Sequence, residues 1–227
     1  MSVLGSQLTF LSEEGTTPGY MARPGESGKY PGVVVIQEWW GLVPHIKEVV
    51  DRFAGQGFVA LAPDLYHGQL ADEPDEARKL AMALERDLAV AEIGSAARYL
   101  ASLDHVSPKK IGVVGWCMGG GLALSTAAEN ASIGAAVCFY GRPLSQTDTA
   151  MLRTPILGLY AGEDHGISVD EVETFRKDLV RFDVPHEIHL YEEAHHAFFN
   201  DTRPVYDAVA AADAWKRTID WFNRYLT

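Results

Sequence analysis

Short runs of consecutive apolar residues alternate along this chain with longer segments in which apolar residues recur every three or four positions. A short uninterrupted apolar run is typical of a buried β-strand, whereas the longer spacing is typical of a helix with one buried face. Residues 33–37 show the first pattern, and residues 45–55 show the second, with Ile46, Val49 and Phe53 on one face. By the same criteria we predict further strands at 58–62, 110–115, 134–140, 156–161 and 187–191, a hairpin of 9–11 and 19–22 that turns around 15–18, and helices at 75–101 (as one helix or two), 118–130, 168–182 and 206–225.

The order of these elements indicates an α/β fold. Strands alternate with helices, and most of the strands lack charged residues, so we expect a mostly parallel central sheet with helices on both faces. No repeat, low-complexity segment or linker interrupts the pattern, and residues 1–227 are therefore predicted to form a single domain. Open sheets of this kind bind ligands beyond the carboxyl ends of their strands, so candidate chemistry should follow those ends.

The composition excludes several classes of function. A chain of 227 residues with 47% apolar residues can bury a core without disulfides or a metal. Lys and Arg number 19 against 31 Asp and Glu, and the resulting net charge of −12 argues against nucleic acid and anionic membranes as partners. No apolar run approaches the ~18 residues of a membrane span. The first ten residues lack a basic segment followed by an apolar one, so we expect no signal peptide and a cytoplasmic location.

The two cysteines lie in different surroundings. Cys138 is inside an apolar run, where a free cysteine behaves as a small buried hydrophobe. Cys117 lies between a predicted strand and a predicted helix, in the sequence Gly115-Trp116-Cys117-Met118-Gly119. In such a turn the nucleophile is strained, and the glycines prevent clashes with the neighbouring strand and helix. Because the helix N-terminus behind the sulfur would favour the thiolate, we predict that Cys117 is a nucleophile.

A thiol nucleophile requires a base, and the base requires a group that orients it. For a nucleophile in this kind of turn the order along the chain is nucleophile, acid, histidine. The segment after the predicted strand at 156–161 offers two carboxylates, Glu163 and Asp164. The segment after the last predicted strand offers two histidines, His195 and His196. Spacing along the chain does not choose between the members of either pair.

Five motifs occur in order between about residue 31 and the C-terminus. They are Gln37-Glu38-Trp39-Trp40-Gly41, Ala62-Pro63-Asp64-Leu65-Tyr66, Gly115-Trp116-Cys117-Met118-Gly119-Gly120, Gly162-Glu163-Asp164-His165 and Tyr191-Glu192-Glu193-Ala194-His195-His196-Ala197-Phe198. As a set they resemble the motifs of the dienelactone hydrolase family, which has the α/β-hydrolase fold. The family's aspartate matches Asp164, and its histidine, two residues before a phenylalanine, matches His196. The resemblance therefore implies a triad of Cys117, His196 and Asp164 that hydrolyses esters or lactones.

The same resemblance implies roles for residues near the third strand. In this family a glutamate, here Glu38, lies beside the cysteine, holds the resting thiol protonated and takes its proton when substrate enters. The backbone N–H groups of Trp39 and Met118 would form the oxyanion hole.

This sequence departs from the family where arginines hold a substrate carboxylate. The matching positions are Pro74 and Asn200, so we expect neutral short esters or lactones to react better than carboxylated ones. Arg78 and Arg203 lie nearby in the sequence and could substitute, and tryptophan and tyrosine side chains suggest an aromatic pocket. The side chains that we predict to contact substrate are Trp40, Tyr66, Arg78 and Arg203.

We therefore predict a hydrolase that cleaves a small-molecule ester or lactone through an acyl-enzyme on Cys117, of the carboxymethylenebutenolidase type. The alternative is a ligand-binding or thiol-sensing protein on the same scaffold. We expect no cofactor and no metal, because His186 and His189 would point to opposite faces of a strand. A monomer or weak homo-oligomer is expected.

Overall fold

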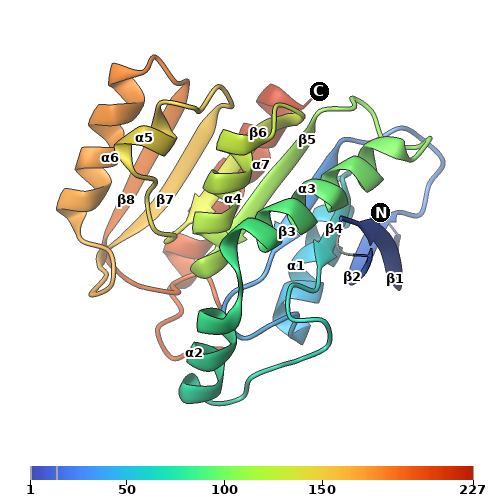
Figure 1. Cartoon of the computed structure of the whole chain (residues 1–227), viewed down its shortest axis with the longest axis horizontal. Helices are drawn as coiled ribbons and strands as arrows, with labels where there is room; N and C mark the ends of the chain where they lie inside the picture. Colours follow the sequence, from blue (N-terminus) through green and yellow to red (C-terminus); the bar gives the residue numbers. More distant parts are fainter. Residues whose placement is uncertain (1, 14, 227) are drawn as a thin grey trace.

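The computed structural model describes residues 2–13 and 15–226 of the chain. Eight strands form one sheet in the order β1-β2-β4-β3-β5-β6-β7-β8 (Figure 1). From β4 to β8 the neighbours are parallel, whereas β1 and β2 are antiparallel additions at one edge. The mostly parallel α/β sheet predicted above is confirmed. The strands are β1 (Val3–Ser12), β2 (Gly15–Pro24), β3 (Gly32–Ile36), β4 (Val59–Pro63), β5 (Ile111–Trp116), β6 (Ile133–Phe139), β7 (Ile156–Glu163) and β8 (His186–His195).

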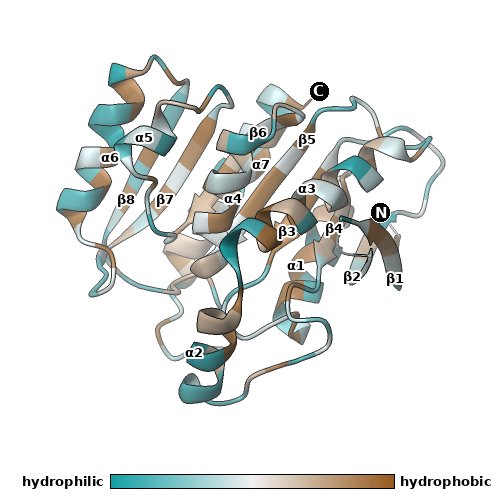
Figure 2. Ribbon diagram, viewed as in Figure 1, coloured by the Kyte–Doolittle hydropathy of each residue, from teal (hydrophilic) through white to brown (hydrophobic). Residues whose placement is uncertain are grey.

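Helices cover both faces of the sheet, as predicted. One face packs against α1 (Pro44–Gly55) and α7 (Ala208–Tyr225), through side chains such as Phe53 and Phe222. The other face packs against α3 (Arg86–Ser102), α4 (Met118–Glu129) and α6 (Val169–Arg181). Figure 2 shows the apolar strands between helices whose outer faces are hydrophilic. The remaining helices are α2 (Pro74–Ala83) and α5 (Gln146–Thr149).

The hairpin turn was predicted at the wrong place. Ser12 pairs with Gly15, so the turn lies before Gly15; residue 14 is outside the described residues. Residues 15–18 belong to β2 instead. Pro18 lacks an N–H, but its carbonyl accepts a hydrogen bond from the Asp64 N–H, so the strand continues through the proline.

The structure also decides between one helix and two over residues 75–101, and it lengthens the last strand. The helical pattern over 75–101 forms two helices, α2 and α3, because Leu84 and Glu85 take extended backbone conformations between them. Strand β8 extends to His195, four residues beyond the predicted end at residue 191. The longer strand brings the segment that contains the two candidate histidines to the end of β7.

Candidate active site

Cys117 occupies the turn between β5 and α4. Its backbone has φ 55° and ψ −118°, a conformation that strains a residue with a side chain. A Cβ added at Gly115 would lie 2.0 Å from the Gly119 carbonyl oxygen, and one added at Gly119 would lie 2.4 Å from that of Gln37. The glycines on either side of the cysteine are therefore required by the close approach of strand and helix, as the sequence pattern predicts.

Strand register determines which carboxylate meets which histidine. Glu163 pairs with His195 as the last residues of the β7–β8 ladder, so the next residue of each strand leaves the sheet beside the other. The Asp164 carboxylate, with only 2% of its side chain exposed, lies 2.6 Å from Nδ1 of His196. A carboxylate can only accept, so His196 donates through Nδ1 and has Nε2 free for the thiol. His195 instead contacts the backbone carbonyl of Glu163, at 3.3 Å.

His196 and Cys117 line the same cavity and interact with each other, which completes a series of three side chains. Burial alone would lower the pKa of His196, but its interactions with Asp164 and Cys117 outweigh burial and raise that pKa to about 10. Burial would likewise raise the pKa of Asp164, but the hydrogen bonds from His196 and two backbone N–H groups lower it below its ordinary value. The Asp164 carboxylate therefore favours the protonated form of the imidazole, which can then give its proton to a leaving group.

Glu38 follows β3 and is almost completely buried, at 2% exposed. Its Oε2 accepts a hydrogen bond of 2.6 Å from the Asn200 side-chain amide, and its Oε1 accepts one of 3.3 Å from the Tyr140 hydroxyl. Burial raises the pKa of Glu38 above its ordinary value, and the hydrogen bond from Asn200 opposes part of that shift. The Glu38 carboxylate thus accepts hydrogen bonds from Asn200 and Tyr140, whereas the Cys117 thiol interacts with His196.

Tyr140 and Asn200 are site residues that the sequence analysis did not identify. Tyr140 directly follows β6, at φ 37°, and its ring centroid lies 5.0 Å from that of His196. The rule that chemistry follows strand ends could have found it. The sequence analysis considered Asn200 only because the family has an arginine at this position. No local signal connects Asn200 to Glu38, which lies 162 positions earlier.

The Cys117 side chain lines a cavity of about 400 Å³, here called the active-site pocket. Arg203 is the one Lys or Arg side chain among the described residues that line it, with the guanidinium carbon 3.8 Å from the centre of the Trp40 ring. Trp40 in turn packs against Ala71 and Ala77, the latter from α2. The pocket is lined by Glu38, Trp39, Trp40, Cys117, His196, Ala197, Arg203, Pro204 and Val205.

Two of the predicted substrate contacts do not line the active-site pocket. Arg78 is exposed on α2 and lies 3.9 Å from Asp75. Tyr66 is 5% exposed, and its hydroxyl donates to the sulfur of Met118 at 3.5 Å, so it supports the turn after Cys117. Of the two predicted oxyanion donors, Trp39 lines the active-site pocket and Met118 is the first residue of α4, whose N–H has no acceptor within the helix.

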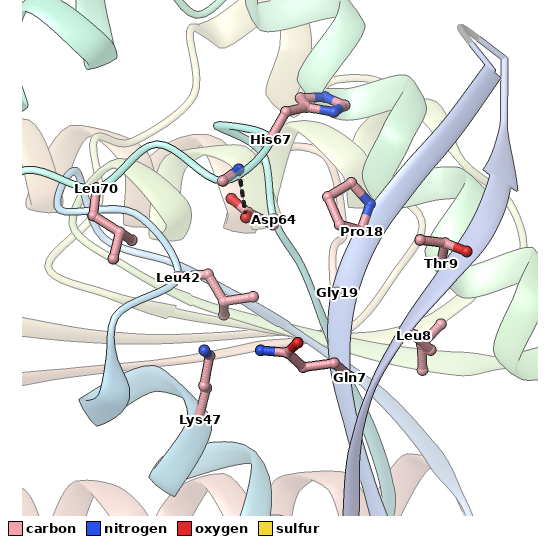
Figure 3. Close-up of a pocket in the computed structure, with 11 residues that line it drawn as sticks. Gln7, Leu8, Thr9, Pro18, Gly19, Leu42, Lys47, Asp64, His67 and Leu70 are labelled. Carbon is pink, nitrogen blue, oxygen red and sulfur yellow. Dashed lines mark hydrogen bonds between the residues drawn. The ribbon is translucent and has the colours of Figure 1, made fainter.

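A larger cavity of about 740 Å³ lies elsewhere, between the β1–β2 edge and the loop after β4 (Figure 3). Lys47 and Gln7 face it from opposite sides, and the Gly68 N–H donates to Asp64 at its wall. It contains none of the candidate catalytic residues.

Within residues 2–13 and 15–226, no group of three or more His, Cys, Asp or Glu side chains could hold a metal ion. None of the helices described is both long and apolar enough to cross a membrane.

Known proteins resemble this chain over nearly its whole length. The chain is 39% identical over 233 residues to Protein usf of Aquifex pyrophilus, covering 99% of this chain and 100% of the relative. A Yersinia pestis protein with the provisional name carboxymethylenebutenolidase is 35% identical, covering 96% and 88%. The crystal structure of a Klebsiella pneumoniae protein, provisionally described as a dienelactone hydrolase, superposes with a TM-score of 0.92 at 31% identity, covering 99% and 100%. The model of the dienelactone hydrolase family matches residues 17–226, and the chain belongs to that family.

Proposed function

We propose that this hydrolase cleaves carboxylic esters or lactones of small molecules through a thioester on Cys117. The single observation that carries the proposal is the series of interacting side chains from Cys117 through His196 to Asp164, with Cys117 at a strained turn beside a cavity. A nucleophile, its base and the group that orients the base are the parts that covalent hydrolysis requires.

The reaction has two halves. In the first, the sulfur of Cys117 bonds to the substrate carbonyl carbon, and the N–H groups of Trp39 and Met118 stabilise the negative oxygen. His196 gives its proton to the departing alkoxide as the carbon–oxygen bond breaks. In the second, His196 takes a proton from water, which attacks the thioester and releases the acid and the thiol.

Glu38 has a separate role in this proposal. With its raised pKa and its place in the lining of the active-site pocket, it can exchange a proton with the thiol before substrate is bound. The hydrogen bonds from Asn200 and Tyr140 would hold it ready beside Cys117.

The partners, the cellular location and the oligomeric state of the enzyme are also proposals. The net charge of −12 supports a protein that does not bind nucleic acid. Cys117 and Cys138 are both free thiols, which supports a reducing, cytoplasmic location. We propose a monomer or weak homo-oligomer, which light scattering over a range of concentrations would test.

The function itself is tested with p-nitrophenyl butyrate and the Cys117→Ala variant. We expect release of p-nitrophenol by the wild type, a butyryl adduct on Cys117 by mass spectrometry, and loss of turnover by at least ~10³ in the variant. Reaction of Cys117 with a generic thiol reagent but with no ester or lactone would overturn the proposal in favour of thiol sensing.

A further inference from the structure

A second cavity adjoins the active-site pocket on the far side of His196. It has a volume of about 450 Å³ and shares His196 and Val205 with the active-site pocket. Its other walls come from the ends of β7 and β8, which lie side by side at the edge of the sheet (Figure 1), and include Glu163 and His165. We call this cavity the acidic hollow.

The proposed reaction gives the acidic hollow a defined position relative to the scissile bond. His196 must reach the oxygen of the leaving alcohol in order to protonate it, so the alcohol part of an ester lies on the His196 side. The acyl part is bonded to Cys117, among Trp39 and Trp40 in the active-site pocket. An alcohol too large to remain beside the imidazole would extend over His196 and Val205 into the acidic hollow.

The charges around the acidic hollow favour one kind of alcohol. Asp164 is engaged by His196 and by the N–H groups of Gly166 and Ile167, but no ion pair among the described residues involves the Glu163 carboxylate. One cation reaches the rim: Arg142 donates to the Gly166 carbonyl.

That cation is neutralised by its own partner, because the Arg142 guanidinium lies 3.2 Å from the Glu171 carboxylate. The remaining ionisable groups in the lining are three histidines, of which His196 is paired with Asp164. Glu163 is an exposed carboxylate without an ion-pair partner among the described residues, and it can attract a cationic ligand.

We propose that the acidic hollow binds the alcohol part of the substrate and favours alcohols that carry a cationic amine or ammonium group. This inference rests on the proposed function, because it uses the position of His196 in the reaction. In the acylation step the Cys117 sulfur bonds to the carbonyl carbon, the bond from that carbon to the alcohol oxygen breaks, and the proton on His196 passes to the alkoxide. The released amino alcohol then leaves through the acidic hollow.

The test compares two esters of one acid at pH 8: butyrylcholine and 3,3-dimethylbutyl butyrate, in which a carbon replaces the charged nitrogen. Both give the same butyryl-enzyme, so deacylation is identical and a difference in kcat/KM reports the step in which the alcohol is still bound. We expect the choline ester to be favoured by about threefold to fivefold at low ionic strength, as for one exposed charge pair, and less at high salt.

The matched variants are Glu163→Gln and Glu193→Gln. Each removes one negative charge, but Glu193 is exposed on β8 and lines neither the active-site pocket nor the acidic hollow. Glu163→Gln should bring the ratio of the two kcat/KM values close to one, and Glu193→Gln should preserve the wild-type ratio.

The outcomes separate this inference from the proposed function. Suppose that p-nitrophenyl butyrate is hydrolysed but the wild type does not prefer the choline ester, or both variants change the kcat/KM ratio equally. Either result would overturn the proposed role of the acidic hollow and leave the proposed function intact. Failure of all three esters, with no butyryl adduct on Cys117, would overturn the proposed function and this inference with it.

Discussion

The side-chain amide of Asn200 donates a 2.6 Å hydrogen bond to the buried carboxylate of Glu38. The family's arginine would put a cation at this position, whereas the amide is a neutral donor. Its other atom, Oδ1, accepts from the Thr202 hydroxyl at 2.7 Å, which fixes the orientation of the amide. Asn200 is itself 1% exposed, so it reaches Glu38 and not the substrate.

Replacement of Asn200 by Ala should change the pH profile of the enzyme. The hydrogen bond from Asn200 lowers the pKa of Glu38, against the larger effect of burial, so its loss raises that pKa further. Glu38 must be ionised to take the thiol proton, and the acidic limb of kcat/KM should therefore move to higher pH. The measurement is kcat/KM for p-nitrophenyl butyrate between pH 5 and 9.

Asn130→Ala is the control for this shift, because Asn130 bonds to Ser132 in another loop. A uniform loss of activity in Asn200→Ala, with the acidic limb unmoved, would mean that Asn200 only fills space.

Alkylation of one thiol per chain should abolish activity. Cys138 is fully buried, and burial raises its pKa to about 12, so it should not react with iodoacetamide in the folded protein. Cys117 lines the active-site pocket and should carry the label. Peptide mass mapping locates the modification. A protein inactivated by label on Cys138 alone would contradict the assignment of the nucleophile.

The two adjacent histidines should differ strongly on substitution. His196→Ala removes the group bonded to both Cys117 and Asp164, so kcat should fall by at least ~10³. The His195 imidazole contacts the Glu163 backbone carbonyl and not the thiol or Asp164, and His195→Ala should change kcat by less than about threefold. Steady-state kinetics with p-nitrophenyl butyrate distinguishes them, and equal losses would mean that His195 also takes part.

Arg203 should limit the preference for neutral substrates. The departures at Pro74 and Asn200 predict that a neutral ester reacts better than a matched carboxylated ester. Arg203 is the one guanidinium or ammonium group among the described residues that line the active-site pocket, so Arg203→Met should increase that preference by about tenfold, the value of one charged hydrogen bond.

The measurement for Arg203 is the ratio of kcat/KM for monomethyl succinate and methyl butyrate at two salt concentrations. Arg78→Met serves as the matched control, because Arg78 is exposed and does not line the active-site pocket. If Arg203→Met leaves this ratio unchanged, Arg203 does not attract the substrate carboxylate and only packs on Trp40.

Two glycines of α4 should respond oppositely to Ala. At Gly119 the new Cβ would lie 2.4 Å from a backbone oxygen of Gln37, so Gly119→Ala should destabilise the fold by about 3 kcal/mol or more. At Gly121 the nearest atom is 3.5 Å away, and Ala there should stabilise the helix by up to about 1 kcal/mol. Urea unfolding of both variants measures the difference. Equal stability of the two variants would contradict the close approach of α4 to β3.

Much of the fold follows from local pattern. The buried strands are short apolar runs, and α1 has its apolar residues on one face, so both could be recognised without tertiary information. The hairpin turn was misjudged because Gly15 and Pro18 are common turn residues, yet here both belong to β2. Asn200, whose partner Glu38 is 162 positions away, carries no local signal of its role.

The sequence alone determined the order of strands and helices and the turn around Cys117, because each depends on neighbouring residues. Gly115 and Gly119 indicate that turn whatever the course of the rest of the chain. Only the tertiary structure decided that His196 meets Asp164. Those residues are 32 positions apart, and their contact depends on the pairing of Glu163 with His195 at the end of the β7–β8 ladder. The register between two strands is set by the packing of the whole sheet, so a local pattern that offers two carboxylates and two histidines cannot choose among them.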